Sequence, residues 1–275
     1  MSDTINPDAI SAFRRAVWRH FRAHGRDLPW RRKVTAYRVF VSEVMLQQTQ
    51  VARVAEFFPV FIKRFPTFAA LAASSPREAL ETWRGLGYNR RALWLRAAAQ
   101  KIVGEHGGRL PRDEVPLRRL PGIGAATAAS LAAFAFNRPT VFLETNIRAA
   151  LIHHFFPSGA KVTERDLLNA AAMTLDRRRP RLWYSALMDY GSWIKRAHSN
   201  PSRRAGVHRP QPRFKGSPRE ARGAVVRALL AAGKPVGAAQ IIRAASGVGP
   251  KRLRAALDAL VAEGMLRRRG GKYSV

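Results

Sequence analysis

The sequence predicts a mainly α-helical protein that ends in a small winged-helix-like domain. Apolar residues recur at three-to-four-residue spacing through most of residues 9–196. Strand patterns are scarce in that stretch. The last segment reads as three helices followed by a basic hairpin with a Gly-Gly turn, which is the order of a winged helix. We therefore expect a first domain over residues 1–196, a basic Pro/Arg-rich linker over 197–217 and a winged-helix-like domain over 218–275.

Helices are expected where apolar residues recur at helical spacing between helix-breaking residues such as glycine and proline. The first begins near residue 9 and stops before Asp27-Leu28-Pro29-Trp30, and Gly107 with Gly108 stops the helix that begins at residue 90. A short extended segment is expected over residues 140–146. In chain order, the expected helices of the first domain cover residues 9–24, 36–53, 52–64, 67–73, 76–84, 90–105, 125–136, 146–156, 164–176 and 181–196.

A glycine-containing turn, Leu120-Pro121-Gly122-Ile123-Gly124, precedes the Ala-rich helix at 125–136. Two glycines around one apolar residue give a turn that is too tight for most side chains. The amides of such a turn lie at the N-terminus of the next helix, where backbone N–H groups and the helix dipole favour a phosphate. The alternative is an ordinary connection between two packed helices, and the pentapeptide alone does not decide between them.

The C-terminal segment is expected to form helices at 218–232, 237–244 and 250–263 before the hairpin at 264–275. If this domain binds DNA, its wing and the helix that carries Lys251, Arg252 and Arg254 are the elements that touch it. The alternative is a small protein-binding or dimerisation module.

The charge of the chain favours a polyanionic partner. The 275 residues include 49 Lys+Arg and 18 Asp+Glu, for a formal net charge of +31. Such a surplus points to nucleic acid. The chain has no cysteine, which excludes disulfides, thiolate zinc sites and cysteine-ligated iron–sulfur clusters, and its seven histidines show no metal-ligand spacing. With no signal-like N-terminus and no apolar run of about 18 residues, we expect a soluble cytoplasmic protein without bound metal or membrane partner.

Four stretches, taken in order, resemble the helix-hairpin-helix DNA glycosylases of the endonuclease III class. They are residues 42–50 (SEVMLQQTQ), 83–88 (WRGLGY), 120–124 (LPGIG) and 144–146 (ETN). The first two are most similar to the adenine DNA glycosylases, and Met188-Asp189-Tyr190-Gly191 is a weaker fifth match. The resemblance covers about residues 10–196 and implies a two-lobed helix-hairpin-helix domain.

The resemblance implies two catalytic carboxylates. Cleavage of an N-glycosidic bond needs a base turned out of the duplex, an acid that protonates the departing base and a negative charge beside the cationic sugar. In adenine glycosylases a Glu of the first stretch is the acid and also activates water; its match is Glu43. An Asp after the hairpin stabilises the sugar, and its match is Glu144, which is one methylene longer.

Further positions are carried over from the same resemblance. Residues that match those entering the duplex beside the flipped base are Gln47, Gln48 and Leu86. The hairpin residues Gly122, Ile123 and Gly124 match the segment that holds the DNA backbone. The base pocket is expected to involve Trp30, Tyr88, Ala126 and Asn146. The alternatives are helix capping for Gln47, Gln48 and Asn146, and core packing for the apolar and aromatic residues.

Three departures from the family pattern narrow the expected reaction. Bifunctional members carry a Schiff-base lysine where this chain has Ala126, and a nearby position that can hold lysine has Arg148, which is a poor nucleophile. Lys195 stands where the first cysteine of the family's iron–sulfur cluster would be. We therefore expect no cluster, no other cofactor and no lyase step.

The resulting expectation is a monofunctional DNA glycosylase of base excision repair. It would act as a nucleoid-associated monomer on double-stranded DNA that contains a lesion or mismatch, and it would leave an abasic site. The nearest family substrate is adenine opposite 8-oxoguanine or guanine. The alternatives are a modified or deaminated pyrimidine as substrate, and a non-catalytic DNA-binding protein that kept the scaffold.

Overall fold

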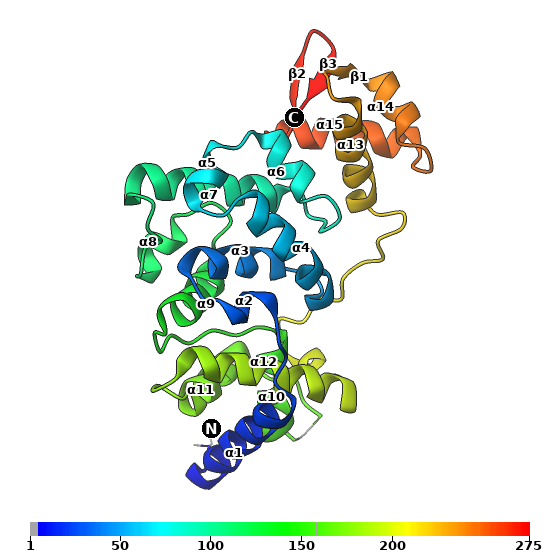
Figure 1. Cartoon of the computed structure of the whole chain (residues 1–275). Helices are drawn as coiled ribbons and strands as arrows, with labels where there is room; N and C mark the ends of the chain where they lie inside the picture. The colour runs from blue at the N-terminus through cyan, green and yellow to red at the C-terminus, as the bar shows by residue number, and fades with distance from the viewer. Residues whose placement is uncertain (1–4, 158) are drawn as a thin grey trace. The chain divides into compact units, whose positions relative to one another are not determined.

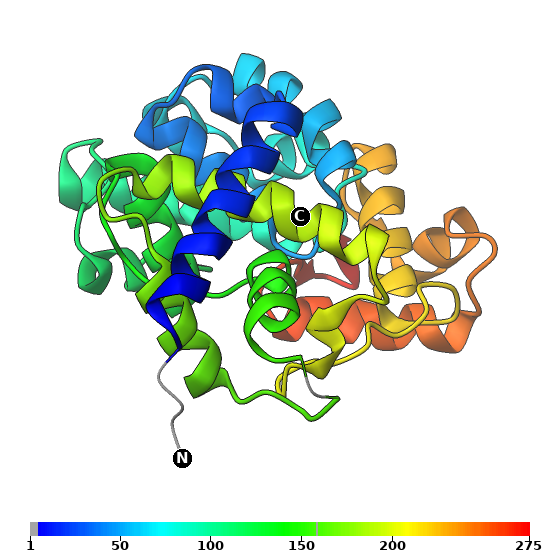
Figure 2. The same cartoon turned by 90° about the horizontal axis from the view of Figure 1, so that it is seen from below.

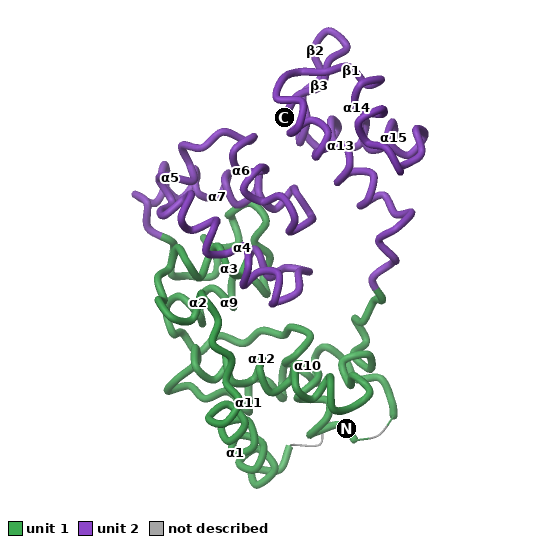
Figure 3. Tube along the Cα trace, turned by 45° about the vertical axis from the view of Figure 1, so that its right-hand side comes forward, with its two compact units in different colours: residues 1–43, 110–210 green, residues 44–109, 211–275 purple. Residues whose placement is uncertain are grey.

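The computed structural model describes residues 5–157 and 159–275. Figure 3 shows that the chain forms two compact units. The first unit contains residues 1–43 and 110–210, and the second contains residues 44–109 and 211–275. The chain passes from the first unit to the second within helix α3 (Ala36–Leu46). The expectation of a mainly α-helical protein is confirmed.

The first unit is built around two packed helices, α10 and α12, with α1 packed against α12 (Figures 1 and 2). Phe13 of α1 and Trp183 of α12 are buried, and their rings meet edge to face with centroids 6.0 Å apart. Helices α9 and α11 contribute further buried residues to the same core. The elements are α1 (Pro7–His24), α2 (Pro29–Arg32), most of α3, α8 (Glu114–Arg118), α9 (Ala125–Phe136), α10 (Thr145–Phe155), α11 (Glu164–Thr174), α12 (Pro180–Ala197) and η1 (Pro201–Arg204).

The N-terminal part of the second unit holds four helices, and side-chain caps start two of them, α5 (Phe68–Ala73) and α6 (Pro76–Thr82). The other two are α4 (Val51–Arg64) and α7 (Arg90–His106). Thr67 caps α5 by accepting a hydrogen bond from the Ala70 amide at 3.1 Å. Ser75 and Glu78 form a reciprocal capping box at the start of α6. These caps satisfy amides that a helix leaves unpaired.

The C-terminal part of the second unit has the element order expected for a winged helix. It contains α13 (Pro218–Ala232), α14 (Ala238–Ala244), α15 (Pro250–Ala262), β2 (Arg267–Arg269) and β3 (Lys272–Ser274). A short strand that was not expected, β1 (Val236–Gly237), pairs with β3, so the antiparallel sheet has the order β1-β3-β2. Gly270 and Gly271 turn the hairpin with φ angles of +52° and +72°. The boundaries proposed at residues 196 and 217 stay a prediction.

One local expectation is wrong. Residues 36–53 do not form one helix, because α3 ends at Leu46, a turn follows and α4 starts at Val51. Gln48 lies in this turn with a φ of +54°, which no α-helix accommodates. The segment expected to be extended over 140–146 forms no strand, Glu144 has extended φ and ψ angles of −132° and 176°, and α10 begins at Thr145, one residue before the expected start. Over the described residues, no helix is long and apolar enough to cross a membrane.

Candidate active site

The two carboxylates singled out in the sequence both belong to the first unit. Glu43 lies on α3, and its Oε2 atom accepts a hydrogen bond of 2.6 Å from the Ser130 hydroxyl on α9. Burial among neighbouring atoms raises the pKa of Glu43 to about 7. The bond from Ser130 opposes this rise, whereas the charge of Glu144 adds to it. Glu43 can therefore carry a proton near neutral pH.

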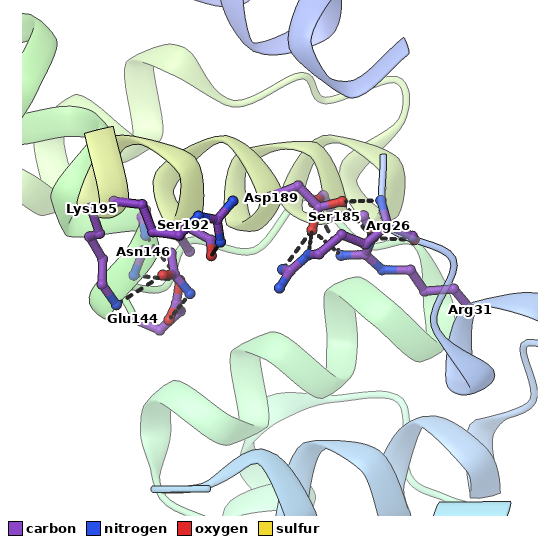
Figure 4. A network of polar contacts seen from close by, with 10 residues as sticks. Arg26, Arg31, Glu144, Asn146, Ser185, Asp189, Ser192 and Lys195 are labelled. Atoms are coloured by element: carbon purple, nitrogen blue, oxygen red, sulfur yellow. Dashed lines mark hydrogen bonds and ion pairs between the residues drawn. The ribbon is translucent and has the colours of Figure 1, made fainter. Parts of the chain in front are cut away.

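Glu144 is the N-cap residue of α10 (Figure 4). Its Oε1 atom accepts hydrogen bonds from the amides of Asn146 at 2.8 Å and Ile147 at 2.9 Å. Its Oε2 atom accepts from the Asn146 side-chain amide at 3.2 Å. Burial raises the pKa of Glu144, and the two backbone amides and the charges of Lys195 and Arg148 oppose that rise.

The two carboxylates thus have different surroundings. Glu43 has one hydroxyl donor and a negative neighbour, which favours the protonated form. Glu144 has three N–H donors and nearby cations, which act against the effect of burial, although its pKa stays above the ordinary value. Two acids in different environments are the usual arrangement for one general acid and one anionic stabiliser, and the donors and cations around Glu144 make it the better candidate for the stabiliser.

Helix α12 supports this site through residues 188–191, the weaker fifth match to the family. Asp189 is buried and accepts hydrogen bonds from the Arg26 amide at 2.9 Å and from the Arg31 guanidinium at 2.8 and 3.0 Å (Figure 4). It thereby fixes the segment between α1 and α2. A Cβ atom at Gly191 would lie 2.0 Å from the carbonyl oxygen of Asn146, so only glycine permits this approach of α12 to the start of α10.

The glycine-containing turn between α8 and α9 has the predicted helix–hairpin–helix geometry. Gly122 has a φ of +77°, and Gly124 is the N-cap of α9. The side chains of Leu120 and Ile123 are buried, with 2% and 6% of their surface exposed. Ile123, which was predicted to bind DNA, can therefore offer a partner its backbone but hardly its side chain. Because Gly124 has no side chain, it leaves the approach to the first amides of α9 open.

The residues expected to enter the duplex lie in the second unit. Gln47 and Gln48 form the turn after α3, and the Gln48 side chain is exposed. Leu86 is only 4% exposed, so the structure does not present its side chain for insertion. Tyr88 has a φ of +48°, and its hydroxyl accepts hydrogen bonds from Arg219 at 3.0 Å and from Gln211. Their insertion into DNA remains a prediction.

The other predicted site residues differ in accessibility. Trp30 is 9% exposed, whereas Ala126 lies exposed in the first turn of α9. In the C-terminal domain Lys251 and Arg254 are exposed. Arg252 lies on the same helix and forms an ion pair with Glu220 at 3.1 Å.

Arg91 on α7 is a structurally important residue that the sequence did not single out. It is 4% exposed, and burial lowers its pKa to about 10. Its guanidinium joins two segments expected to probe DNA, since it donates to acceptors in the last turn of α3, in the turn that follows α3 and in the turn before α7. These acceptors are the carbonyl oxygens of Val44 (2.9 Å), Met45 (2.8 Å), Gln47 (2.6 Å), Leu86 (3.3 Å) and Gly87 (3.1 Å), and the hydroxyl of Thr49 (2.9 Å).

Substitution of Arg91 by methionine is expected to lower the free energy of unfolding by about 3 kcal/mol, because it leaves several buried carbonyl groups without donors. Chemical denaturation of the variant and the parent protein measures this difference. Arg84→Met is the matched control, since the Arg84 side chain is exposed. A loss at Arg91 no larger than that of the control would contradict the role of the guanidinium in holding the two turns.

Comparisons with known proteins identify the family. Residues 41–172 match the HhH-GPD superfamily of base excision DNA repair proteins. The adenine DNA glycosylase of Mycolicibacterium smegmatis is 36% identical over 260 residues, which cover 88% of each chain. The adenine DNA glycosylase of Homo sapiens is 36% identical over 198 residues, which are 67% of this chain and 36% of that protein.

Solved structures share the helical fold. A thermostable thymine-DNA glycosylase superposes with a TM-score of 0.61 at 22% identity and covers 67% of this chain and 87% of its own. Endonuclease III in a non-covalent DNA complex gives a TM-score of 0.56 at 17% identity, over 76% and 91% of the two chains. The fold is thus one that DNA glycosylases use. The chain belongs to the HhH-GPD superfamily of base excision DNA repair proteins and is a DNA glycosylase.

The iron–sulfur cluster that the endonuclease III class implies does not fit this chain. None of the 275 residues is a cysteine, so the chain provides no thiolate ligand. Lys195, at the position of the first expected ligand, instead donates a hydrogen bond to Asn146.

Proposed function

We propose that the protein is a monofunctional adenine DNA glycosylase, which removes adenine mispaired with 8-oxoguanine or guanine and leaves an abasic site. The observation that carries the proposal is the pair Glu43 and Glu144. Burial raises the pKa of Glu43 to about 7, which leaves it a proton to donate near neutral pH, whereas three N–H donors and two nearby cations at Glu144 act against the rise in pKa that burial causes there. The adenine substrate is supported by the relatives that bear this activity in their names.

The proposed reaction uses the pair in two steps. With the adenine turned out of the duplex, Glu43 donates its proton to the base while the glycosidic bond breaks and its electron pair leaves with the base. The carboxylate of Glu144 stabilises the positive charge that develops on the sugar. Water then attacks the anomeric carbon and gives a proton back to Glu43, so both acids return to their starting states.

The absence of a lyase step is supported by the residues at the relevant positions. Ala126 has no amine, and Arg148 forms an ion pair with Glu164 of α11. A guanidinium in an ion pair stays protonated and does not form a Schiff base.

Double-stranded DNA is the proposed partner, bound by a monomer. The formal net charge of +31 favours a polyanion, and the open N-terminus of α9 behind the hairpin suits a backbone phosphate. In the C-terminal domain, the exposed Lys251 and Arg254 and the basic strand β2 offer additional phosphate contacts.

The test is a panel of duplexes that each carry one lesion or mismatch, incubated with the protein and then treated with alkali. We expect cleavage after alkali at adenine opposite 8-oxoguanine or guanine, and intact strands without alkali. Release of a modified pyrimidine alone would replace adenine as the substrate. Binding without cleavage of any duplex would favour a non-catalytic DNA-binding protein, and strand breaks before alkali would reveal a lyase.

A further inference from the structure

Lys195 is linked to the proposed catalytic carboxylate by two consecutive hydrogen bonds (Figure 4). Its ammonium donates to the Oδ1 atom of Asn146 at 3.1 Å, and the Nδ2 atom of Asn146 donates to Oε2 of Glu144 at 3.2 Å. The lysine belongs to α12, and the other two residues belong to the start of α10. Residues 49 positions apart in the sequence therefore end in one polar network.

The backbone of α12 brings Lys195 to this position. Gly191 lies one helical turn before Lys195 and contacts the carbonyl of Asn146 so closely that a Cβ atom has no room. Residues four apart lie on the same face of a helix, so Lys195 faces the same end of α10. Ile194, next to it, is fully buried and anchors this turn of α12.

The ammonium also decides how the Asn146 side chain is oriented. A lysine ammonium has three donors and no acceptor, so the amide oxygen of Asn146 must face it. The amide nitrogen then faces Glu144 and donates to it. The ammonium and the carboxylate therefore favour the same orientation of the amide, and without the lysine only the contact with Glu144 holds it.

Lys195 is one of several charged groups around Glu144. Arg148, on the same helix as Glu144, is paired with Glu164 of α11, which offsets its charge. Glu43 of α3 is the negative neighbour. From η1, Arg204 donates to Phe156 at the far end of α10. Within residues 5–157 and 159–275, Lys195 is therefore the cation that hydrogen bonds through Asn146 connect to Glu144.

We propose that Lys195 is a positioning residue that fixes the Asn146 amide and, through it and through its own positive charge, holds the side chain of Glu144 in place and favours its carboxylate form. The inference rests on the proposed function, because it assigns Lys195 to the carboxylate that the proposed reaction uses. Lys195 acts through Asn146 and is not itself a group that reacts.

The sign of the expected pH effect follows from the two opposing contributions. Burial raises the pKa of Glu144, and the positive charge of Lys195 lowers it. Removal of the positive charge of Lys195 therefore raises the pKa of Glu144 further. During acidification, Glu144 of the variant takes up its proton at a higher pH than Glu144 of the parent protein. Because the reaction needs the carboxylate, the acidic side of the pH–rate profile moves to higher pH.

The first test compares single-turnover excision rates of the parent, Lys195→Met, Lys195→Arg and the charge-matched control Lys161→Met, whose lysine is exposed. We expect Lys195→Met to lower the rate about tenfold at neutral pH and to shift the acidic limb upward. Lys195→Arg should keep the limb in place, and Lys161→Met should match the parent. If the acidic side of the pH–rate profile of Lys195→Met stays at the pH of the parent, the inference is overturned, even if the variant excises less base. Partial misfolding reduces the amount of active enzyme but does not shift the profile along the pH axis.

A second measurement does not depend on activity. Titration of protein labelled with ¹³C at the glutamate carboxyl groups, with Glu144→Gln for assignment, reports the ionisation of Glu144 directly. We expect its midpoint to rise in Lys195→Met and to stay near the parent value in Lys195→Arg. An unchanged midpoint in Lys195→Met would overturn the inference. If no duplex is cleaved by the parent protein, the proposed function fails, and this titration still decides whether Lys195 controls Glu144.

Discussion

Replacement of Glu43 by glutamine is expected to lower the single-turnover rate of base excision by about 10³-fold, because glutamine cannot donate a proton to the leaving base or activate water. The measurement is alkali-revealed cleavage of an adenine mispair duplex with enzyme in excess. Affinity for the same duplex should change little, since the substitution removes no cation. Glu56→Gln is the matched control, because it makes the same change at an exposed position on α4.

The same variant has an expected effect on stability that goes in the opposite direction. The folded-state pKa of Glu43 is raised to about 7, so above that pH the folded protein carries a buried charge that the unfolded chain carries in water. Glutamine removes this cost. Above pH 7 we therefore expect Glu43→Gln to unfold at a higher denaturant concentration than the parent.

Excision by Glu43→Gln at a rate comparable to that of the parent would contradict the role of Glu43 in the proposed mechanism.

Replacement of Glu144 by glutamine is expected to lower the excision rate by about 10²- to 10³-fold, because the neutral amide cannot stabilise the cationic sugar. Glu144→Asp keeps the charge and can still accept from the first amides of α10, so we expect it to retain more activity than Glu144→Gln. Single-turnover rates of the two variants on one duplex measure the difference.

The control for Glu144 must separate chemistry from helix capping. Thr163 caps the neighbouring helix α11 by accepting from the Asp166 amide at 3.1 Å. Thr163→Ala should cost about 1 kcal/mol of stability, as the loss of an N-cap does, and leave the excision rate unchanged. If Glu144→Gln loses stability but no more activity than Thr163→Ala, then Glu144 is only a cap.

The sequence allowed the parts of the site that depend on local patterns to be predicted. The helix–hairpin–helix turn follows from Gly122 and Gly124, and the winged-helix order follows from helix spacing and a Gly-Gly turn, because these features depend on neighbouring residues. The candidate roles of Glu43 and Glu144 came from the order of motifs. Their contacts agree with these roles without testing them.

The contacts between distant segments could not be predicted in this way. Arg91 binds groups 42 to 47 residues away, and the arginines at positions 26 and 31 reach Asp189 across about 160 residues. A single arginine on a helix has no period or flanking pattern that reveals its partner. The turn at Gln48 was missed for the same reason, because Arg91, a distant residue, satisfies the carbonyl groups released where α3 ends.

The contact between Gly191 and Asn146 has a consequence for how harmful variants would be recognised. At this point α12 and the start of α10 meet backbone to backbone, without a side chain between them. One added methyl group at residue 191 is therefore enough to displace the start of α10. An alanine at 191 would push the start of α10 outward and carry Glu144 with it, and displacements near 1 Å cost about a hundredfold in rate. Gly191→Ala is a chemically conservative change at a residue that does not take part in the reaction. In an activity assay it would nevertheless resemble a defect in Glu144.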